Sequence, residues 1–307
     1  MSGVSKIRVP VLVVGGSGQI GQNLLDGLAT AGVAATGTYF RNPESGLIQL
    51  DASDPYQVMQ VTADLKPGLI INASNAQGGT DACELEEGLA NRYHFGNGKN
   101  LADAAKQHGA KLVQISTDYV FDGEAGPYSE FDEAHPISKL GDAKLRLERY
   151  MLQSSPDALI IRTSFVYSWT PESKTKNFAM QVLENCQARQ QMKVPFDQVG
   201  SVTYAPNFSE ALLEMAGIGL TGLYHVAGTT RCSKLDWALQ IAGFFGLDSA
   251  PIKGVSTEEL AQAGPRPLES GFVFDKVNRE LKTTRLMSLE EGLSDMKSRM
   301  PVGNLLS

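Results

Sequence analysis

The chain has 307 residues, of which 42% are hydrophobic and 20% charged, and its net charge of −7 argues against nucleic-acid binding through a basic surface. This length allows one large domain or two lobes around an extensive core. The three cysteines, Cys83, Cys186 and Cys232, are widely spaced, which predicts free thiols in a reducing cytoplasm and no metal site. The sequence has no apolar run of membrane-spanning length and no signal-peptide pattern, so we expect a cytoplasmic protein with no membrane partner.

Short apolar runs alternate with helical patterns in the first half of the chain. The run 9–15 is typical of a strand buried on both faces, and apolar residues at helical spacing follow in 18–31. Asp54 followed by Pro55 predicts the start of a second helix. The alternation predicts a doubly wound parallel sheet, with further strands at 33–40, 47–50, 69–72, 111–116 and 158–163.

A glycine-rich loop joins the first predicted strand to the first helix. It reads Gly15-Gly-Ser17-Gly18-Gln19-Ile20-Gly21, with glycines three residues apart. Ordinary turns also gather glycine, but a strand–turn–helix context is typical of a dinucleotide site of the Rossmann type. In such a site the loop approaches the pyrophosphate, and the third glycine lets helix and strand pack closely.

The end of the second predicted strand indicates which dinucleotide is bound. Residues 38–42 contain no acidic side chain for a ribose 2′-hydroxyl, and Arg41 is placed to meet a 2′-phosphate instead. The sequence therefore favours NADP(H) over NAD(H). A solvated surface arginine is the alternative interpretation of Arg41.

Two further strand ends extend the predicted cofactor site. Asp51 and Ala52 follow the third strand, where Asp51 either contacts the adenine amino group or caps a local turn. Asn72, Ala73 and Ser74 end the fourth strand beside the expected nicotinamide ribose.

The second half of the chain has a looser pattern. Helices are predicted near 174–189, 205–218 and 233–245, strands at 222–226 and 271–274, and capping boxes at 256–259 and 288–291. We therefore expect an NADP(H)-binding Rossmann domain at 1–165 and a smaller α/β substrate lobe at 166–307, with interleaved segments. The lobe should cover the carboxyl edge of the sheet, where ligands bind in open α/β folds.

The segment 116–123, which reads Ser-Thr-Asp-Tyr-Val-Phe-Asp-Gly, resembles the dTDP-4-dehydrorhamnose reductase family of extended short-chain dehydrogenases/reductases. The same pattern occurs in the regulatory beta subunit of methionine adenosyltransferase. Supporting blocks lie at 15–21, 100–105, 127–130, 162–167, 177–178, 222–225 and 266–267.

This resemblance implies roles for individual residues. Thr117 matches the hydroxyl that orients the substrate carbonyl, and Asp118 and Tyr119 match residues of the same pocket. Lys144 matches the lysine that binds the nicotinamide ribose. Phe165 falls where the family often has a tryptophan near the sugar, and Asn177 and Arg266 match positions that meet the nucleotide phosphates.

The chain departs from the family at the reacting centre. The family has a tyrosine four residues before the lysine, whose charge lowers the tyrosine pKa, and this chain has Leu140 there. His94 stands where the family usually has an asparagine. Asp118, Tyr119, Tyr128 and His94 are candidate substitute acids, although each also fits a structural role: Asp118 in a turn, Tyr119 in the wall, Tyr128 in loop packing and His94 in the core.

Three functions are consistent with these features. The first is an NADP(H)-linked oxidoreductase that acts on a nucleotide sugar or related polar carbonyl with a non-standard proton donor. The second is a catalytically inactive dinucleotide-binding protein that regulates a partner, and the third is non-redox chemistry with a bound nicotinamide. The retained pocket residues favour an enzyme, and a homodimer or a regulatory protein partner is compatible with either interpretation.

Overall fold

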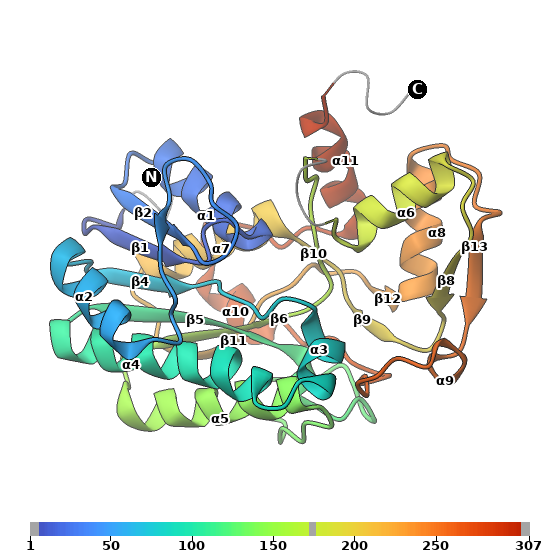
Figure 1. Ribbon diagram of the computed structural model, residues 1–307. Helices are drawn as coiled ribbons and strands as arrows, with labels where there is room; N and C mark the ends of the chain where they lie inside the picture. The colour runs from blue at the N-terminus through green and yellow to red at the C-terminus, as the bar shows by residue number, and fades with distance from the viewer. Residues whose placement is uncertain (1–5, 172–175, 302–307) are drawn as a thin grey trace.

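A seven-stranded parallel sheet forms the largest part of the protein (Figure 1). The computed structural model describes residues 6–171 and 176–301. The strand order is β3-β2-β1-β4-β5-β6-β11, and every neighbouring pair is parallel. The doubly wound sheet is therefore confirmed, and its strands are β1 (Val11–Val14), β2 (Ala35–Tyr39), β3 (Ile48–Gln49), β4 (Leu69–Asn72), β5 (Lys111–Thr117), β6 (Leu159–Thr163) and β11 (Gly222–His225).

Helices cover both faces of this sheet, which explains the continuous apolar runs of its strands. Successive side chains of β1 point to opposite faces: Val11 and Val13 pack in one hydrophobic cluster, and Leu12 and Val14 in another. In Figure 1, α1 (Gln19–Thr30) and α7 (Ala205–Gly217) lie on one face, and α2 (Pro55–Leu65), α4 (Asn97–His108) and α5 (Lys139–Ser154) lie on the other.

Local capping sets where two of these helices begin. The Asp54 carboxylate accepts the backbone N–H groups of Tyr56 and Gln57, and Pro55 occupies the first turn, as the sequence predicted. Ser138 caps α5 by accepting the N–H of Gly141. Because α5 starts there, Leu140 and Lys144 lie one turn apart on its buried side.

A smaller lobe lies beside the carboxyl edge of the sheet. Its hydrophobic core includes Tyr167, Leu183, Trp237 and Leu293. Its elements are the helices α6 (Phe178–Gln187), α8 (Lys234–Phe244) and α11 (Leu289–Arg299) and the strand pairs β7 (Val166–Tyr167) with β10 (Thr203–Tyr204), β8 (Met192–Pro195) with β13 (Ile252–Val255), and β9 (Val199–Ser201) with β12 (Arg231–Ser233).

Predictions for the second half had mixed outcomes. Ser288 forms a complete capping box with Glu291, but Ser256 only accepts the Glu259 N–H and starts the four-residue helix α9 (Thr257–Leu260). The predicted strand 271–274 is wrong. Gly271 has φ +105°, which interrupts the extended backbone, and Phe272 makes a single bridge to Tyr128 before α10 (Asp275–Glu280) begins. The predicted helix 174–189 starts partly outside the described residues.

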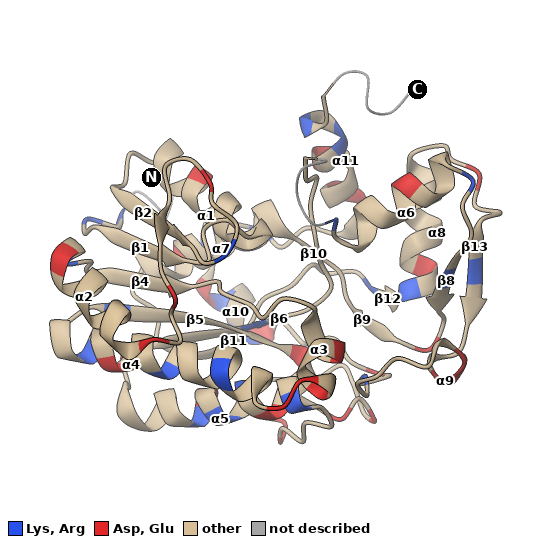
Figure 2. Ribbon diagram, viewed as in Figure 1, with Lys and Arg blue, Asp and Glu red and all other residues tan. Residues whose placement is uncertain are grey.

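Segments from the second half of the chain return to the sheet. Helix α7 packs against α1, and β11 forms the edge next to β6. Basic and acidic residues are interspersed along α4 and α5 (Figure 2). None of the described helices has the length and apolar character needed to cross a bilayer.

Candidate functional site

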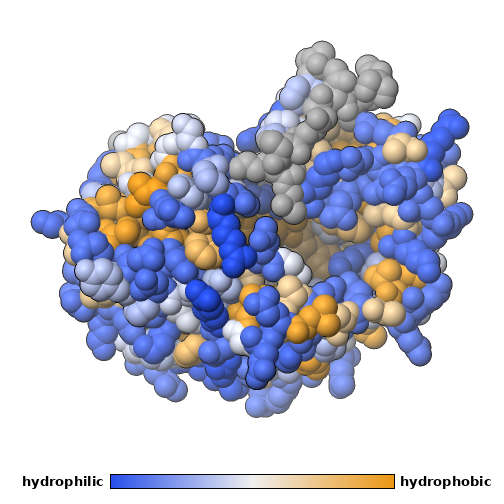
Figure 3. Space-filling model, viewed as in Figure 1, coloured by the Kyte–Doolittle hydropathy of each residue, from blue (hydrophilic) through white to orange (hydrophobic). Residues whose placement is uncertain are grey.

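A cavity of about 1580 Å³ lies at the carboxyl ends of the sheet strands, next to the smaller lobe. Figure 3 shows this face of the molecule hollowed between its two parts. The loops after β1, β2, β4, β5 and β6 line one side, and Phe178, Lys234 and Trp237 line the other. This is the position at which open α/β sheets bind ligands.

The glycine loop after β1 is built for a close backbone approach. Gly15 has φ +82°, and a Cβ there would lie 2.8 Å from the Ser74 backbone. A Cβ on Gly21 would lie 2.1 Å from the Gly15 carbonyl oxygen. Each glycine is therefore required by packing, and the two bring the loop against β4 and the first turn of α1 against the loop.

The loop before α1 and the first turn of that helix face the cavity, and the N–H groups of Ser17 and Gly18 already donate to the carbonyls of Thr38 and Gly15. Ser17, Gly18, Gln19 and Ile20 line the cavity, whereas Gly21 does not and acts through packing. The N–H groups of the first helical residues have no acceptor within their own helix, so they suit a phosphate. The residues thus fit the pyrophosphate of a dinucleotide.

Arg41 lies at the rim of the cavity beside two aromatic rings. Its guanidinium carbon is 5.0 Å from the centroid of Phe40, and its Nη2 donates to the Tyr93 hydroxyl at 3.3 Å. Arg41 is exposed, which keeps the guanidinium accessible for a phosphate. Tyr93 was not predicted, because it belongs to a π-helical turn, Asn91–Gly96, that sequence periodicity does not reveal.

Asp51 follows β3 and serves a local turn. Its carboxylate accepts the N–H and the hydroxyl of Ser53, and it pairs with Arg92 at 3.3 Å. The turn alternative is thus present, and Asp51 and Ala52 also line the cavity. Contact with an adenine remains a prediction.

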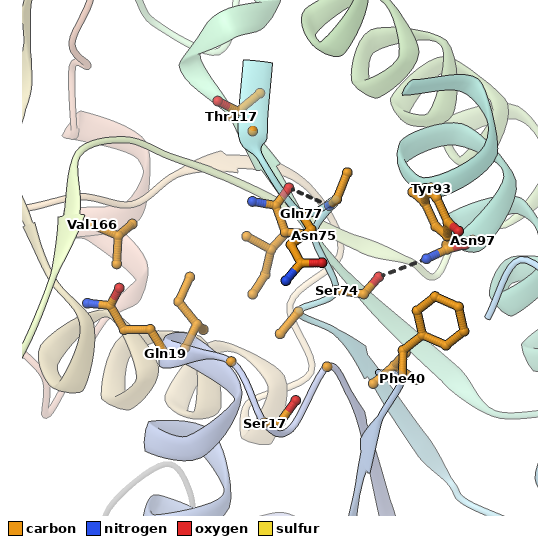
Figure 4. Close-up of a pocket in the computed structure, with 18 of the residues that line it drawn as sticks. Ser17, Gln19, Phe40, Ser74, Asn75, Gln77, Tyr93, Asn97, Thr117 and Val166 are labelled. Carbon is orange, nitrogen blue, oxygen red and sulfur yellow. Dashed lines mark hydrogen bonds between the residues drawn. The ribbon is translucent and has the colours of Figure 1, made fainter. Parts of the chain in front are cut away.

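The three predicted residues at the end of β4 have different positions. Ala73 and Ser74 line the cavity, but Asn72 is buried and does not. The Asn72 amide donates to Gln114 and accepts from both the N–H and the hydroxyl of Ser74. Asn72 therefore holds Ser74 in place. Figure 4 shows Ser74 next to Asn97, whose amide donates to the Ser74 hydroxyl at 3.4 Å.

Thr117, Asp118 and Tyr119 lie together at the end of β5, and all three line the cavity. The Thr117 hydroxyl donates to Asp118 at 3.1 Å, and the Ser270 hydroxyl donates to the other Asp118 oxygen at 2.8 Å. Burial raises the pKa of Asp118 to about 6 despite these hydrogen bonds. Burial and the charge of Asp118 raise the pKa of Tyr119 to about 12.

Lys144 and Leu140 face this group from α5. The Lys144 ammonium donates to the Ile115 carbonyl at 3.0 Å, and burial lowers the Lys144 pKa to about 8 although Glu148 favours its charge. Leu140 also lines the cavity and packs in an apolar cluster that Tyr119 adjoins. Position 140, where the resemblance implies a tyrosine, therefore carries a hydrocarbon side chain, and the replacement itself stays a prediction.

The other two candidate acids are poorly placed. His94 is buried, and neither ring nitrogen has a hydrogen-bond partner in the part of the chain that the structure describes. Burial, followed by the charge of Lys144, lowers the pKa of His94 to about 3. It is therefore neutral at neutral pH. Tyr128 stacks on Phe121, and its hydroxyl donates to Asp122. Neither His94 nor Tyr128 lines the cavity.

The three predicted substrate residues are only partly brought together. Phe165 lines the cavity, has φ +42°, and stacks on Trp237 with ring centroids 5.7 Å apart. A positive φ is unusual for an aromatic residue, and residues in this conformation are found preferentially at functional sites.

Asn177 and Arg266 do not line the cavity. The Asn177 side chain caps α6 and donates to Ser168. Arg266 is buried in an ion pair with Asp81 at 2.9 Å. Their predicted contacts with substrate phosphates stay predictions. Among the described residues, no group of three or more His, Cys, Asp or Glu side chains is arranged to hold a metal.

Comparisons with known proteins agree with this architecture. A family model for the RmlD substrate binding domain matches residues 9–301. The dTDP-4-dehydrorhamnose reductase of Salmonella typhimurium is 34% identical over 301 residues, which cover 94% of this chain and 97% of that protein. The enzyme of the same name from Aggregatibacter actinomycetemcomitans is 30% identical over 281 residues, or 88% of this chain and 92% of that protein.

A solved structure is also similar to this chain over almost its whole length. The dTDP-4-dehydrorhamnose reductase of Bacillus anthracis, determined in complex with NADP, superposes with a TM-score of 0.86 at 29% identity. The match covers 96% of this chain and 100% of that one.

Proposed function

The chain belongs to the dTDP-4-dehydrorhamnose reductase family, and from this premise we propose that it binds NADP(H) and reduces the carbonyl group of a nucleotide sugar or related polar sugar. The observation that carries the proposal is the cavity itself. It runs from the glycine loop and Arg41, through Thr117 and Lys144, to the aromatic wall of the smaller lobe. One ligand site can therefore hold a dinucleotide and a sugar side by side.

The proposal divides the chain between the two ligands. The glycine loop, Arg41 and the ends of β3 and β4 would hold NADP(H), with residues 1–165 as the cofactor domain. Residues 166–307 would supply most of the substrate side. Two segments of that range, α7 and β11, pack on the sheet and support the cofactor domain instead.

In the reaction, one hydride goes to the carbonyl carbon and one proton to the carbonyl oxygen. NADPH, when bound, supplies the hydride. Lys144 would bind the nicotinamide ribose, and the Thr117 hydroxyl would orient the carbonyl. The single Thr117 proton is donated to Asp118, so Thr117 would donate to the carbonyl only after the hydroxyl turns from Asp118 to the substrate, and Asp118 would hold it beforehand.

We assign the proton to Tyr119. A phenol with a pKa of about 12 keeps its proton at neutral pH, and Tyr119 lines the cavity next to the cluster that holds Leu140. Asp118 is less suitable, since a pKa of about 6 leaves it mostly ionised at neutral pH. Asp118 therefore acts as a positioning residue.

The test is NADPH oxidation in the presence of dTDP-4-dehydrorhamnose. Tyr119→Phe should lower kcat about 10²–10⁴-fold, as loss of a general acid does. Tyr93→Phe is the matched control, because Tyr93 lines the same cavity at its Arg41 end and should leave kcat within a few-fold. Equal kcat in the wild type and Tyr119→Phe would exclude Tyr119 as the donor.

A second candidate function is a dinucleotide-binding protein without turnover. Leu140 and His94 favour it: Leu140 carries no hydroxyl, and the His94 ring, which makes no hydrogen bond within the described part of the chain, does not line the cavity. Such a protein would bind NADPH normally and show no oxidation above background with any sugar nucleotide.

A further inference from the structure

Lys234 is a cation in the substrate half of the cavity that the sequence did not single out. It is the first residue of α8, lines the cavity, and lies with its ammonium 5.3 Å from the centroid of the Phe165 ring. A cation at a helix N-terminus meets the positive end of the helix dipole, which disfavours it. Helix stability therefore does not explain a lysine at this position.

The Lys234 ammonium lacks an anionic partner. Within the described part of the chain, no carboxylate pairs with it and no acceptor takes a hydrogen bond from it. The charged groups that face it are Asp118 after β5, Asp81 on α3 (Gly79–Leu85) and Arg266. Asp81 already pairs with Arg266, and Asp118 already accepts from Thr117 and Ser270.

Other donors on the same wall are also unused. The Trp237 indole nitrogen and the Thr170 hydroxyl are buried and have no hydrogen-bond partner among residues 6–171 and 176–301, and both residues line the cavity. Unpaired buried donors and a half-buried unpaired cation are costly unless a ligand satisfies them. All three groups can donate to an acceptor, and the charge of the Lys234 ammonium favours an acceptor that is negatively charged.

We propose that Lys234 forms an anion subsite that binds a negatively charged oxygen group of the sugar substrate, either a phosphate or a carboxylate. This inference rests on the proposed function for the identity of the substrate as a sugar derivative. The stacked pair Phe165 and Trp237 would form the apolar floor beside this subsite. Substrates with an anionic group at this end would bind better than neutral sugars.

Protonation gives an independent signature of the subsite. Burial, followed by the charge of Arg266, lowers the pKa of Lys234 to about 8, although Asp118 and Asp81 favour its charge. An anion bound to the ammonium must raise that pKa. Binding near or above pH 8 should then be accompanied by proton uptake, which calorimetry detects as a dependence of the binding heat on buffer ionisation enthalpy.

The experiment uses dTDP as the phosphate probe and D-glucuronate as the carboxylate probe, titrated into the full-length protein by calorimetry. Lys234→Met should weaken the probe that occupies the subsite about 10- to 100-fold, the loss expected for a charge-assisted hydrogen bond. It should also abolish proton uptake, and Lys234→Arg should restore most of the affinity.

Lys276→Met is the matched control. The Lys276 ammonium also lies over an aromatic ring, 4.2 Å from the centroid of Tyr224, but it donates to the Leu223 carbonyl and does not line the cavity. This variant should bind both probes like the wild type.

The outcomes separate the proposals. Loss of dTDP affinity alone identifies the anion as a phosphate, and loss of glucuronate affinity alone identifies it as a carboxylate. Failure of the wild type to bind either probe, or unchanged affinities in Lys234→Met, overturns the subsite. NADPH titrations run in parallel, because loss of NADPH binding by the wild type would instead overturn the proposed function.

Discussion

Replacing Leu140 with tyrosine tests the prediction that this site lacks the tyrosine of its family and takes its proton from Tyr119. Leu140 is 7% exposed and lies one helical turn before Lys144, whose pKa is about 8. A phenol at position 140 would have its pKa lowered by the lysine charge and would belong to the lining of the cavity that Thr117 also lines. A well-placed general acid contributes about 10²–10⁴ in rate.

The expected gain depends on whether Tyr119 already supplies the proton. In the wild-type background we expect Leu140→Tyr to raise kcat by no more than about tenfold, because the proposal already gives Tyr119 the role of proton donor. In the Tyr119→Phe background the same change should recover at least about tenfold of the lost rate. The assay is NADPH oxidation with dTDP-4-dehydrorhamnose under single-turnover conditions.

Leu140→Phe separates the hydroxyl from the added bulk. Both substitutions enlarge a side chain in the cluster that contains Ala76, Cys83 and Ala143, and each should cost about 1–3 kcal/mol of unfolding free energy. The phenylalanine variant should give no rescue. Equal rates for the tyrosine and phenylalanine variants in the Tyr119→Phe background would refute the assignment of an acid to this part of the cavity.

Three other predictions concern the cofactor loop and the fold. Arg41→Ala should lower NADPH affinity about tenfold or more and leave NADH affinity nearly unchanged, since one charge-assisted contact is lost. Equal losses of NADPH and NADH affinity, measured by calorimetry, would reject a contact between Arg41 and the 2′-phosphate. Gly21→Ala should abolish measurable NADPH binding, whereas Gly27→Ala in the same helix meets only the flexible Leu213 side chain and should retain it. Hydrogen bonds from Thr283, Lys282 and Thr284 outweigh the burial of Glu214 and lower its pKa to about 2. Glu214 therefore contributes to the free energy of unfolding above pH 4.5, and this contribution is lost as pH falls towards 2. Chemical denaturation should show that Glu214→Gln costs on the order of 2 kcal/mol at neutral pH and removes that acid dependence.

Strong local patterns made the sheet predictable. The apolar runs at β1, β4 and β6 are buried on both faces, and this double burial produces the continuous pattern that a parallel strand needs. Capping at Asp54 and Ser288 depends only on neighbouring residues, so both helix starts followed from the sequence. The strand expected at 271–274 failed because Gly271 takes a positive φ, which an apolar pattern does not encode.

The site was less predictable where it depends on distant contacts. The glycine loop and Thr117 were found because they lie at strand ends, which all meet at one edge of the sheet. Lys234 and Tyr93 could not be found in this way. Each reaches the cavity from a helix whose position depends on the packing of the whole fold. Conversely, Arg266 looked available in the sequence but is paired with Asp81.

Transfer of deuterium from C4-deuterated NADPH to dTDP-4-dehydrorhamnose tests the central claim most directly. The account predicts that the reduced sugar nucleotide gains one deuterium, seen by mass spectrometry. It also predicts that Thr117→Val and Tyr119→Phe slow this transfer while NADPH binding persists. Tight NADPH binding without any deuterium in the sugar would contradict reduction of dTDP-4-dehydrorhamnose, and the same result with other 4-keto nucleotide sugars would favour a dinucleotide-binding protein without turnover.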